Sequence, residues 1–192
     1  MLITISGVPG SGKTTVAKLL AQRLALPHVY AGDLYRREAK RRGLTLEQFN
    51  QECERDHSID RELDAQMAER ARQGNVVLEG RLAGYLAADN HLPALKVWLD
   101  AGDETRARRV AEREDSDWRA VLEANRSRHH SDASRYRAIY GYDLADTGVY
   151  DVVLATDDRT PEELVEELIR VARERFDGGR PPCGPGSPRA TT

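Results

Sequence analysis

The chain of 192 residues has only two cysteines, Cys53 and Cys183, and no long hydrophobic run. Two cysteines argue against a disulfide framework and against a structural zinc site. No apolar stretch approaches the length of a membrane span, and the N-terminal run 1–5 is too short for a secretion signal. We therefore expect a cytoplasmic protein with no membrane partner.

The sequence also lacks an excess of positive charge, since its formal net charge is −3. A nucleic-acid-binding protein carries a basic surface, so we expect no nucleic-acid partner. The basic residues are almost all arginine, which binds phosphate through a planar fork, whereas a lysine acts as a point charge. The length is that of one domain with its own core, and we expect a monomer.

Short apolar runs alternate with amphipathic helical patterns along the chain. The runs that predict buried parallel strands are Leu2–Ser6, Val76–Glu79, Leu95–Leu99 and Asp151–Ala155, with a weaker one at His28–Ala31. The last helix has a clear predicted start, with Thr160 as N-cap, Pro161 at the first position and Glu163 at the third. This alternation predicts an α/β domain built on a five-stranded parallel sheet.

Two segments interrupt the alternation with helical patterns and no strand, namely 44–73 and 103–140. Both lie between predicted strands, where an α/β enzyme can carry mobile elements that cover a substrate. From residue 177 onward the chain is rich in glycine and proline, a composition typical of disorder. We expect a folded domain over 1–176 and a disordered tail over 177–192.

A phosphate-binding motif follows the first predicted strand directly and opens the first helix. It matches G-x-x-x-x-G-K-[ST] at every fixed position and consists of Gly7, Val8, Pro9, Gly10, Ser11, Gly12, Lys13 and Thr14, with Thr15 next in the helix. Such a loop turns backbone N–H groups and a helix N-terminus toward an anion. Lys13 can then reach the β- and γ-phosphates of ATP, and the Thr14 hydroxyl can bind Mg²⁺.

An acidic residue ends each of two predicted strands, Glu79 the one and Asp100 the other. Ligands of α/β proteins bind at the carboxyl edge of the sheet, so either carboxylate could organise a water bound to Mg²⁺. We favour Glu79 because Gly80 and Arg81 follow it and place a phosphate-binding cation nearby. The alternative is that both acids are ordinary polar strand ends.

Three further segments resemble nucleoside monophosphate kinases, in the order that family has them. Gly32-Asp33-Leu34-Tyr35-Arg36 resembles their Gly-Asp-x-x-Arg element, and Glu79-Gly80-Arg81 their second acceptor-phosphate arginine. Arg128, Asp132 and Arg135 match R-x-x-x-D-x-x-R, the lid pattern of cytidylate kinases. The segments 60–64, 74–81 and 136–143 are similar to the short archaeal-type cytidylate kinases in particular. The resemblance covers 1–172.

The resemblance implies a three-layer P-loop fold, with an acceptor-binding segment over 33–73 and a lid over 103–140. It implies that Arg36 and Arg81 bind the acceptor phosphate and that Asp33 helps to organise the metal. It further implies transfer of the γ-phosphoryl group of ATP to CMP or dCMP. The lid would bring Arg128 and Arg135 onto the transferring group, oriented by Asp132, while Arg109 or Arg113 stacks on the adenine.

The nature of the acceptor depends on fewer residues than the kinase chemistry does. Larger cytidylate kinases have an aspartate that reads the base directly after the second acceptor arginine, and this chain has Leu82 there. Asp60 and Arg61 could bind the cytosine edge, or they could lie on the solvated face of a helix. Alternatives are therefore another acceptor, such as AMP, dephospho-coenzyme A or a metabolite, and a regulatory ATP-binding module.

Overall fold

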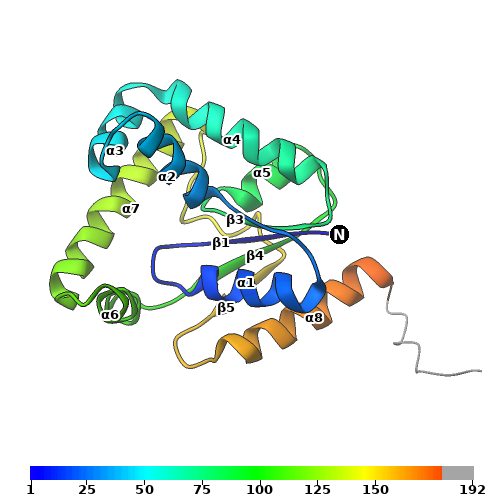
Figure 1. The fold of residues 1–192 in the computed structure, drawn as a ribbon. Coiled ribbons are helices and arrows are strands. Elements are labelled where there is room, and N and C mark those ends of the chain that lie inside the picture. Colours follow the sequence, from blue (N-terminus) through cyan, green and yellow to red (C-terminus); the bar gives the residue numbers. More distant parts are fainter. Residues whose placement is uncertain (179–192) are drawn as a thin grey trace, which may run out of the picture.

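A computed structural model describes residues 1–178 and shows a single parallel sheet at the centre of the protein (Figure 1). Its order is β2-β3-β1-β4-β5, and every neighbouring pair is parallel. The strands are β1 (Leu2–Gly7), β2 (His28–Tyr30), β3 (Val76–Glu79), β4 (Ala94–Asp100) and β5 (Val152–Ala155). The five predicted strands are confirmed, each to within one residue at either end.

Helices cover both faces of this sheet and complete three layers (Figure 1). The helices are α1 (Lys13–Leu24), α2 (Ala31–Arg41), α3 (Leu46–Arg55), α4 (His57–Arg72), α5 (Ala83–Asp89), α6 (Asp103–Glu114), α7 (Trp118–Tyr140) and α8 (Pro161–Asp177). Helices α1 and α8 pack on one face, and α4 and α5 pack on the other. The predicted three-layer α/β fold is therefore confirmed.

The period-2 alternation of the strands assigns each side chain to one of the two faces. Ile3, Ile5 and Val77 are buried against α1 and α8, whereas Leu2 and Leu78 are buried on the opposite face. The same parity places Glu79 on the α1 face, beside the start of that helix. A strand of this kind reads as continuously apolar because both of its faces are covered.

The two interrupting segments form α3 with α4 and α6 with α7, as the helical patterns predicted. Phe49 and Cys53 of α3 pack with Ile59 of α4 in a small apolar cluster of their own, apart from the sheet. Cys53 is buried as a free thiol. Helix α7 runs from α6 up to the α3 region and so connects the two segments in space (Figure 1).

Helix α8 begins with the predicted capping box, in which Thr160 and Glu163 bond reciprocally and Pro161 occupies the first turn. It ends at Asp177, with Gly178 as its C-cap in the left-handed conformation. The expected disordered tail otherwise lies outside the described residues. Within residues 1–178, none of the helices has the length and apolarity to cross a membrane.

Candidate active site

The phosphate-binding loop lies at the carboxyl end of β1, the central strand, and its last residue precedes Lys13 at the start of α1. Gly10 and Gly12 have φ angles of 80° and 84°, a region that side chains with a Cβ rarely adopt. A Cβ on Gly10 would also lie 2.6 Å from the backbone oxygen of Arg106. The loop conformation thus requires glycine, as the motif predicts.

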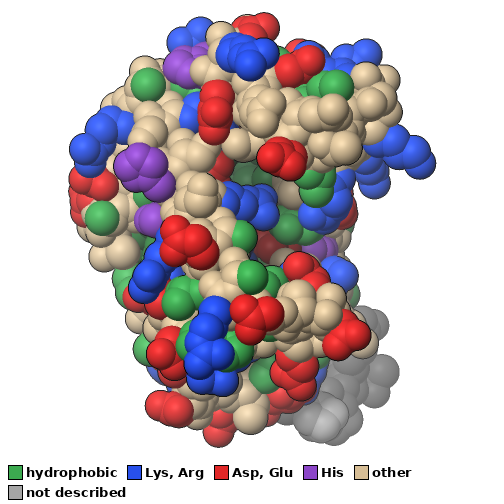
Figure 2. All heavy atoms as spheres, turned by 90° about the vertical axis from the view of Figure 1, so that its left-hand side faces the viewer, with side chains coloured by type: hydrophobic (Ala, Val, Ile, Leu, Met, Phe, Trp, Pro, Cys, Tyr) green, Lys and Arg blue, Asp and Glu red, His purple; other side chains and the backbone are tan. Residues whose placement is uncertain are grey.

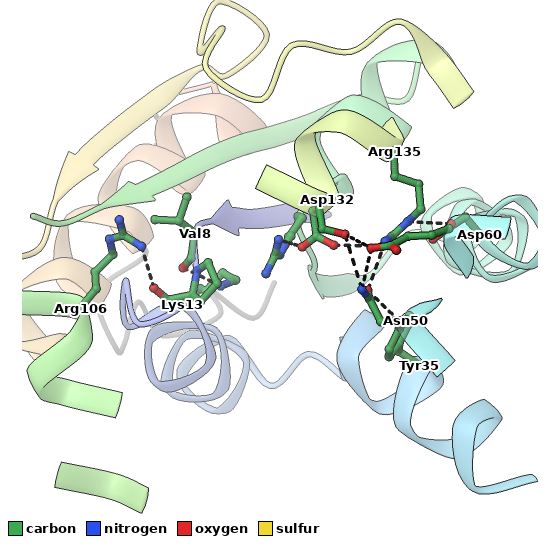
Figure 3. A network of polar contacts seen from close by, with 12 residues as sticks. Val8, Lys13, Tyr35, Asn50, Asp60, Arg106, Asp132 and Arg135 are labelled. Atoms are coloured by element: carbon green, nitrogen blue, oxygen red, sulfur yellow. Dashed lines mark hydrogen bonds and ion pairs between the residues drawn. The ribbon is translucent and has the colours of Figure 1, made fainter. Parts of the chain in front are cut away.

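Lys13 turns back over this loop, and its Nζ donates to the carbonyl oxygen of Val8 at 2.9 Å (Figure 3). Burial, and after it the positive charge of the nearby Arg81, lower the pKa of Lys13 to about 7. The Ser11 hydroxyl is buried in the loop without a hydrogen-bond partner. A buried ammonium and an unpartnered hydroxyl are groups that a bound phosphate would satisfy.

The Thr14 hydroxyl donates to Oε1 of Glu79 at 2.5 Å, so the sheet edge and α1 meet at a pair of oxygen ligands. Glu79 is fully buried, and its other oxygen lies 2.9 Å from Nε2 of His28. Asp100, the other candidate acid, instead accepts from the backbone N–H of Ala101. A hydroxyl and a carboxylate suit Mg²⁺, which prefers oxygen ligands and keeps several waters and phosphate oxygens.

A buried chain of charges joins the carboxyl end of β3 to both helical segments (Figure 3). Arg81, just after β3, contacts the carboxylate of Asp132 on α7. Asp132 accepts from Nη2 of Arg135 at 3.0 Å, and Nε of Arg135 lies 2.8 Å from Asp60 on α4. A third nitrogen of Arg135 donates to Asn50 on α3 at 3.2 Å.

The members of this chain are withdrawn from solvent, since Asp60, Asp132 and Arg135 are each only 4% exposed. Charges in such surroundings interact at low effective dielectric and must be paired. Burial lowers the pKa of Arg81 to about 9, and the next largest effect is the positive charge of Arg128. Both the burial of Arg81 and the neighbouring charge of Arg128 favour a further anion beside these guanidiniums.

The remaining acceptor candidates lie on α2, on α4 and directly after β3. Arg36 is exposed and donates to Asp33 at 2.6 Å, with its guanidinium 4.9 Å from the ring centre of Tyr30. The carboxylate of Asp33 thus holds Arg36. Arg61 lies exposed on α4. Gly80, which precedes Arg81, is buried where a Cβ would lie 3.0 Å from Ala31.

The lid arginines differ in their surroundings. Arg109 donates to Oγ1 of Thr156 at 2.9 Å and to the carbonyl oxygen of that residue at 2.6 Å, so it holds the loop after β5. Arg113 is exposed and pairs with its neighbour Glu114. Arg128 is exposed on α7, near enough to Lys13 and Arg81 to lower the pKa of both.

Four residues at this site escaped the sequence analysis, namely His28, Asn50, Arg106 and Thr156. Arg106 donates to the carbonyl oxygen of Pro9 at 3.2 Å and so contacts the phosphate-binding loop from α6 (Figure 3). The Thr156 hydroxyl donates to the carbonyl oxygen of Ser11 at 3.1 Å. A signal existed only for His28, which has the right parity on its strand to face Glu79 once β2 is placed beside β3.

The space-filling view shows a hollow on this side of the molecule, with Lys or Arg side chains inside it and charged groups around it (Figure 2). A glycine loop between the central strand and its helix, a buried lysine, and cations on two flanking helical segments together define a P-loop kinase. Comparison with known proteins identifies the family within this class.

Residues 2–158 match the model of the cytidylate kinase-like family, and the chain belongs to that family. It is 43% identical to the cytidylate kinase of Methanopyrus kandleri, over 90% of this chain and 92% of that protein. It is also 43% identical to the cytidylate kinase of Methanocaldococcus jannaschii, over 81% and 88%. A gluconokinase from Sinorhizobium meliloti shares the fold, with a TM-score of 0.60 at 17% identity over 93% and 97% of the two chains.

Proposed function

We propose that this protein transfers the γ-phosphoryl group of ATP, bound with Mg²⁺, to the phosphate of CMP or dCMP. The observation that carries the proposal is the buried chain Arg81–Asp132–Arg135–Asp60, because it brings the family's acceptor and lid residues together at the carboxyl edge of the sheet. The names and identity of the relatives support cytidylate as the acceptor over AMP, dephospho-coenzyme A, a metabolite or a purely regulatory role.

The donor side consists of the loop 7–12 and the start of α1. Backbone N–H groups of the loop bind the phosphates of ATP, and the Lys13 ammonium neutralises them. Thr14 would hold Mg²⁺ directly and Glu79 would hold its waters, and the ion would neutralise charge that develops during phosphoryl transfer. Arg109 fixes the loop after β5 that lines the donor side, while Arg113 on the next turn adds positive charge.

The acceptor side consists of Arg36 and Arg81 together with the residues that orient them. Both guanidiniums bind the acceptor phosphate and align it with the donor, which is most of what phosphoryl transfer requires of a protein. Asp33 keeps Arg36 in place at 2.6 Å. Asp60 and Arg61 offer the acceptor and donor groups that a cytosine edge needs, Asp60 beside Arg135 and Arg61 exposed on the same helix.

The lid contributes two arginines with different roles. Arg128 is exposed, so it is free to approach the transferring phosphoryl group when substrates bind. Arg135 is instead bound to Asp60, Asp132 and Asn50, and it holds the carboxylate of Asp132 against Arg81. Asp132 therefore connects Arg135, one of the two arginines of the lid pattern, to the acceptor arginine Arg81.

An acceptor panel tests the proposal. We expect kcat/KM at fixed ATP and Mg²⁺ to be highest for CMP and dCMP, lower for UMP and poor for AMP. The Lys13→Ala variant, purified in the same way, serves as the control for contaminating kinases. A kcat/KM for AMP that exceeds that for CMP by about tenfold, some 1.4 kcal/mol in transition-state binding, would contradict the cytidylate assignment.

A further inference from the structure

Three side chains from three different elements form a continuous row between the edge of the sheet and the phosphate-binding helix. His28 of β2 lies 2.9 Å from Glu79 of β3, and Glu79 accepts from the Thr14 hydroxyl of α1 at 2.5 Å. Only Glu79 and Thr14 are parts of the proposed metal site. His28 has no assigned role in the reaction described above.

The position of His28 follows from the register of the sheet. His28 pairs with Val77 and Tyr30 pairs with Glu79, so all four side chains project from the same face, toward α1. The Tyr30 ring lies nearly parallel to the imidazole, at 11° and 6.3 Å between centres. The imidazole is therefore oriented by its neighbour on one side and by the Glu79 carboxylate on the other.

This arrangement fixes the carboxylate of Glu79. Each of its oxygens has a partner, Thr14 on Oε1 and His28 on Oε2, so the carboxylate plane cannot rotate freely. An ionised carboxylate only accepts hydrogen bonds, and hence Nε2 of His28 carries a proton and donates it. The Thr14 proton points to Glu79, which leaves the lone pairs of the hydroxyl oxygen available on its other side.

We propose that His28 is a positioning residue for Mg²⁺, acting through Glu79 on the Thr14 hydroxyl. Without the hydrogen bond from His28, the fully buried carboxylate of Glu79 would lose its fixed orientation, and the Thr14 hydroxyl would lose the direction of its lone pairs. Glu79 is the hydrogen-bond partner of the metal ligand Thr14, and His28 is the partner of Glu79. Outer-shell partners contribute about 10–100-fold to metal affinity, and we expect His28, one bond further out, to lie at the lower end of that range. The inference rests on the proposed function only for the use of ATP with Mg²⁺.

The test measures metal binding without catalysis. Mn²⁺, a spectroscopic probe for Mg²⁺, is titrated into the protein saturated with a non-hydrolysable ATP analogue, and free Mn²⁺ is followed by electron paramagnetic resonance. We expect His28→Ala to weaken Mn²⁺ binding about tenfold. Affinity for the same nucleotide analogue in the presence of chelator should stay within about twofold, because the loop itself is unchanged.

Two variants separate positioning from structure. His28→Gln, whose amide nitrogen can donate to Glu79, should restore Mn²⁺ affinity to within about threefold of wild type. His91→Asn, in an exposed turn with positive φ that asparagine tolerates, removes another imidazole and should leave Mn²⁺ binding unchanged.

Unchanged Mn²⁺ affinity in His28→Ala would overturn the proposal. So would an equal loss of affinity in the glutamine variant, or an equal loss of metal-free nucleotide binding, which would show that His28 only ties β2 to β3. Because no acceptor is present in the titration, its outcome is independent of whether CMP is the true acceptor.

Discussion

Lys13 combines a buried position with a positive charge. This combination determines how its replacement affects ATP binding and the stability of the protein. The surroundings that lower its pKa to about 7 also make the ammonium costly to bury in the free protein. A bound triphosphate compensates that cost, so the side chain contributes to ligand binding more than to folding. Residues of this kind are expected at functional sites.

We therefore expect Lys13→Ala to lower kcat/KM for ATP by at least about 100-fold, as the loss of one preorganised donor does elsewhere. The free energy of unfolding should stay the same or rise, because a desolvated charge is removed. A coupled assay and urea denaturation measure the two quantities. Turnover within tenfold of wild type in a folded variant would contradict the role of the phosphate-binding loop.

Arg128 and Arg135 lie two turns apart on α7 and should respond differently to replacement. Arg135→Ala leaves Asp60 buried without its ion-pair partner and leaves Asp132 paired with Arg81 alone. Such a break in a buried ion pair costs about 3–5 kcal/mol of stability. Arg128→Ala should change stability by less than about 0.5 kcal/mol and lower kcat by about 10³, with a smaller effect on KM. Urea denaturation of both variants measures the loss of stability. Steady-state kinetics with both substrates varied measures the change in kcat and KM.

Equal stability of the two variants would show that the buried chain does not hold α7 in place. A kcat within threefold of wild type for Arg128→Ala would show that this arginine is a surface charge. Arg119→Ala, on the first turn of α7, is a matched control for the loss of one exposed arginine on the same helix.

At the scale of helices, Asp64 connects α4 with the end of α7. Tyr140 donates to its carboxylate at 2.7 Å. Burial raises the pKa of Asp64 from 3.8 to about 7, the Tyr140 hydrogen bond acts against that shift, and the charge of Asp60 adds to it. The folded state therefore keeps a proton that the unfolded chain releases above its ordinary aspartate pKa.

Since the folded state binds this extra proton, the titration of Asp64 should lower the free energy of unfolding as the pH rises from about 4 to about 7. Asp64→Asn keeps an acceptor for Tyr140 and removes the titration, so its stability should depend less on pH in that window. Denaturation of both proteins at several pH values measures the difference. The control is Glu62→Gln, exposed on the same helix, and a parallel profile for Asp64→Asn and wild type would contradict the prediction.

The sequence predicts the elements well and their contacts poorly. The five strands, the phosphate-binding loop and the capping box at Thr160 are local patterns, with apolar runs, fixed glycines and N-cap chemistry within a few residues. Asn50, Arg106 and Thr156 contact site residues that lie 85, 97 and 145 positions away. No local pattern encodes such pairs, because they depend on strand order and on how α7 packs over α3.

Family resemblance identified acceptor and lid residues that local patterns did not reveal. It could not predict the contacts and the solvent exposure of each of these side chains. The resemblance gave Arg135 and Arg128 the same role. In the structure, Arg135 contacts three protein side chains, whereas Arg128 is exposed. The role of Asp33 as a metal organiser stays a prediction, and the structure adds that its carboxylate pairs with Arg36. The role of each of these side chains depends on which groups it contacts, and the three-dimensional fold determines those contacts.

For the whole molecule, the sheet with α1 and α8 forms one continuous core, while α3 packs mainly in a small cluster beside it. Segments with few buried apolar contacts open at low free-energy cost. A bisubstrate ligand that joins cytidine and adenosine through phosphates should therefore slow amide hydrogen exchange in α3, α6 and α7 by more than tenfold. Exchange in α8 and β4 should change by less than twofold.

Mass spectrometry of proteolytic peptides resolves these regions, and ATP alone provides the comparison. Protection spread evenly over the sheet would show that the ligand stabilises the protein as a unit, without a distinct closing segment. Protection of α6 without α3 under ATP alone would agree with the proposed division between donor and acceptor sides.

Helix α6 contacts the phosphate-binding loop in two ways, through the bond from Arg106 to Pro9 and through the close fit of Gly10 against the Arg106 backbone. These contacts determine where the junction should be placed in a chimera of two related kinases. A graft that replaces the lid from Asp103 onward would exchange the support of the loop together with the lid. A graft that begins in the turn between Glu114 and Trp118 would leave that support intact and transfer α7 alone.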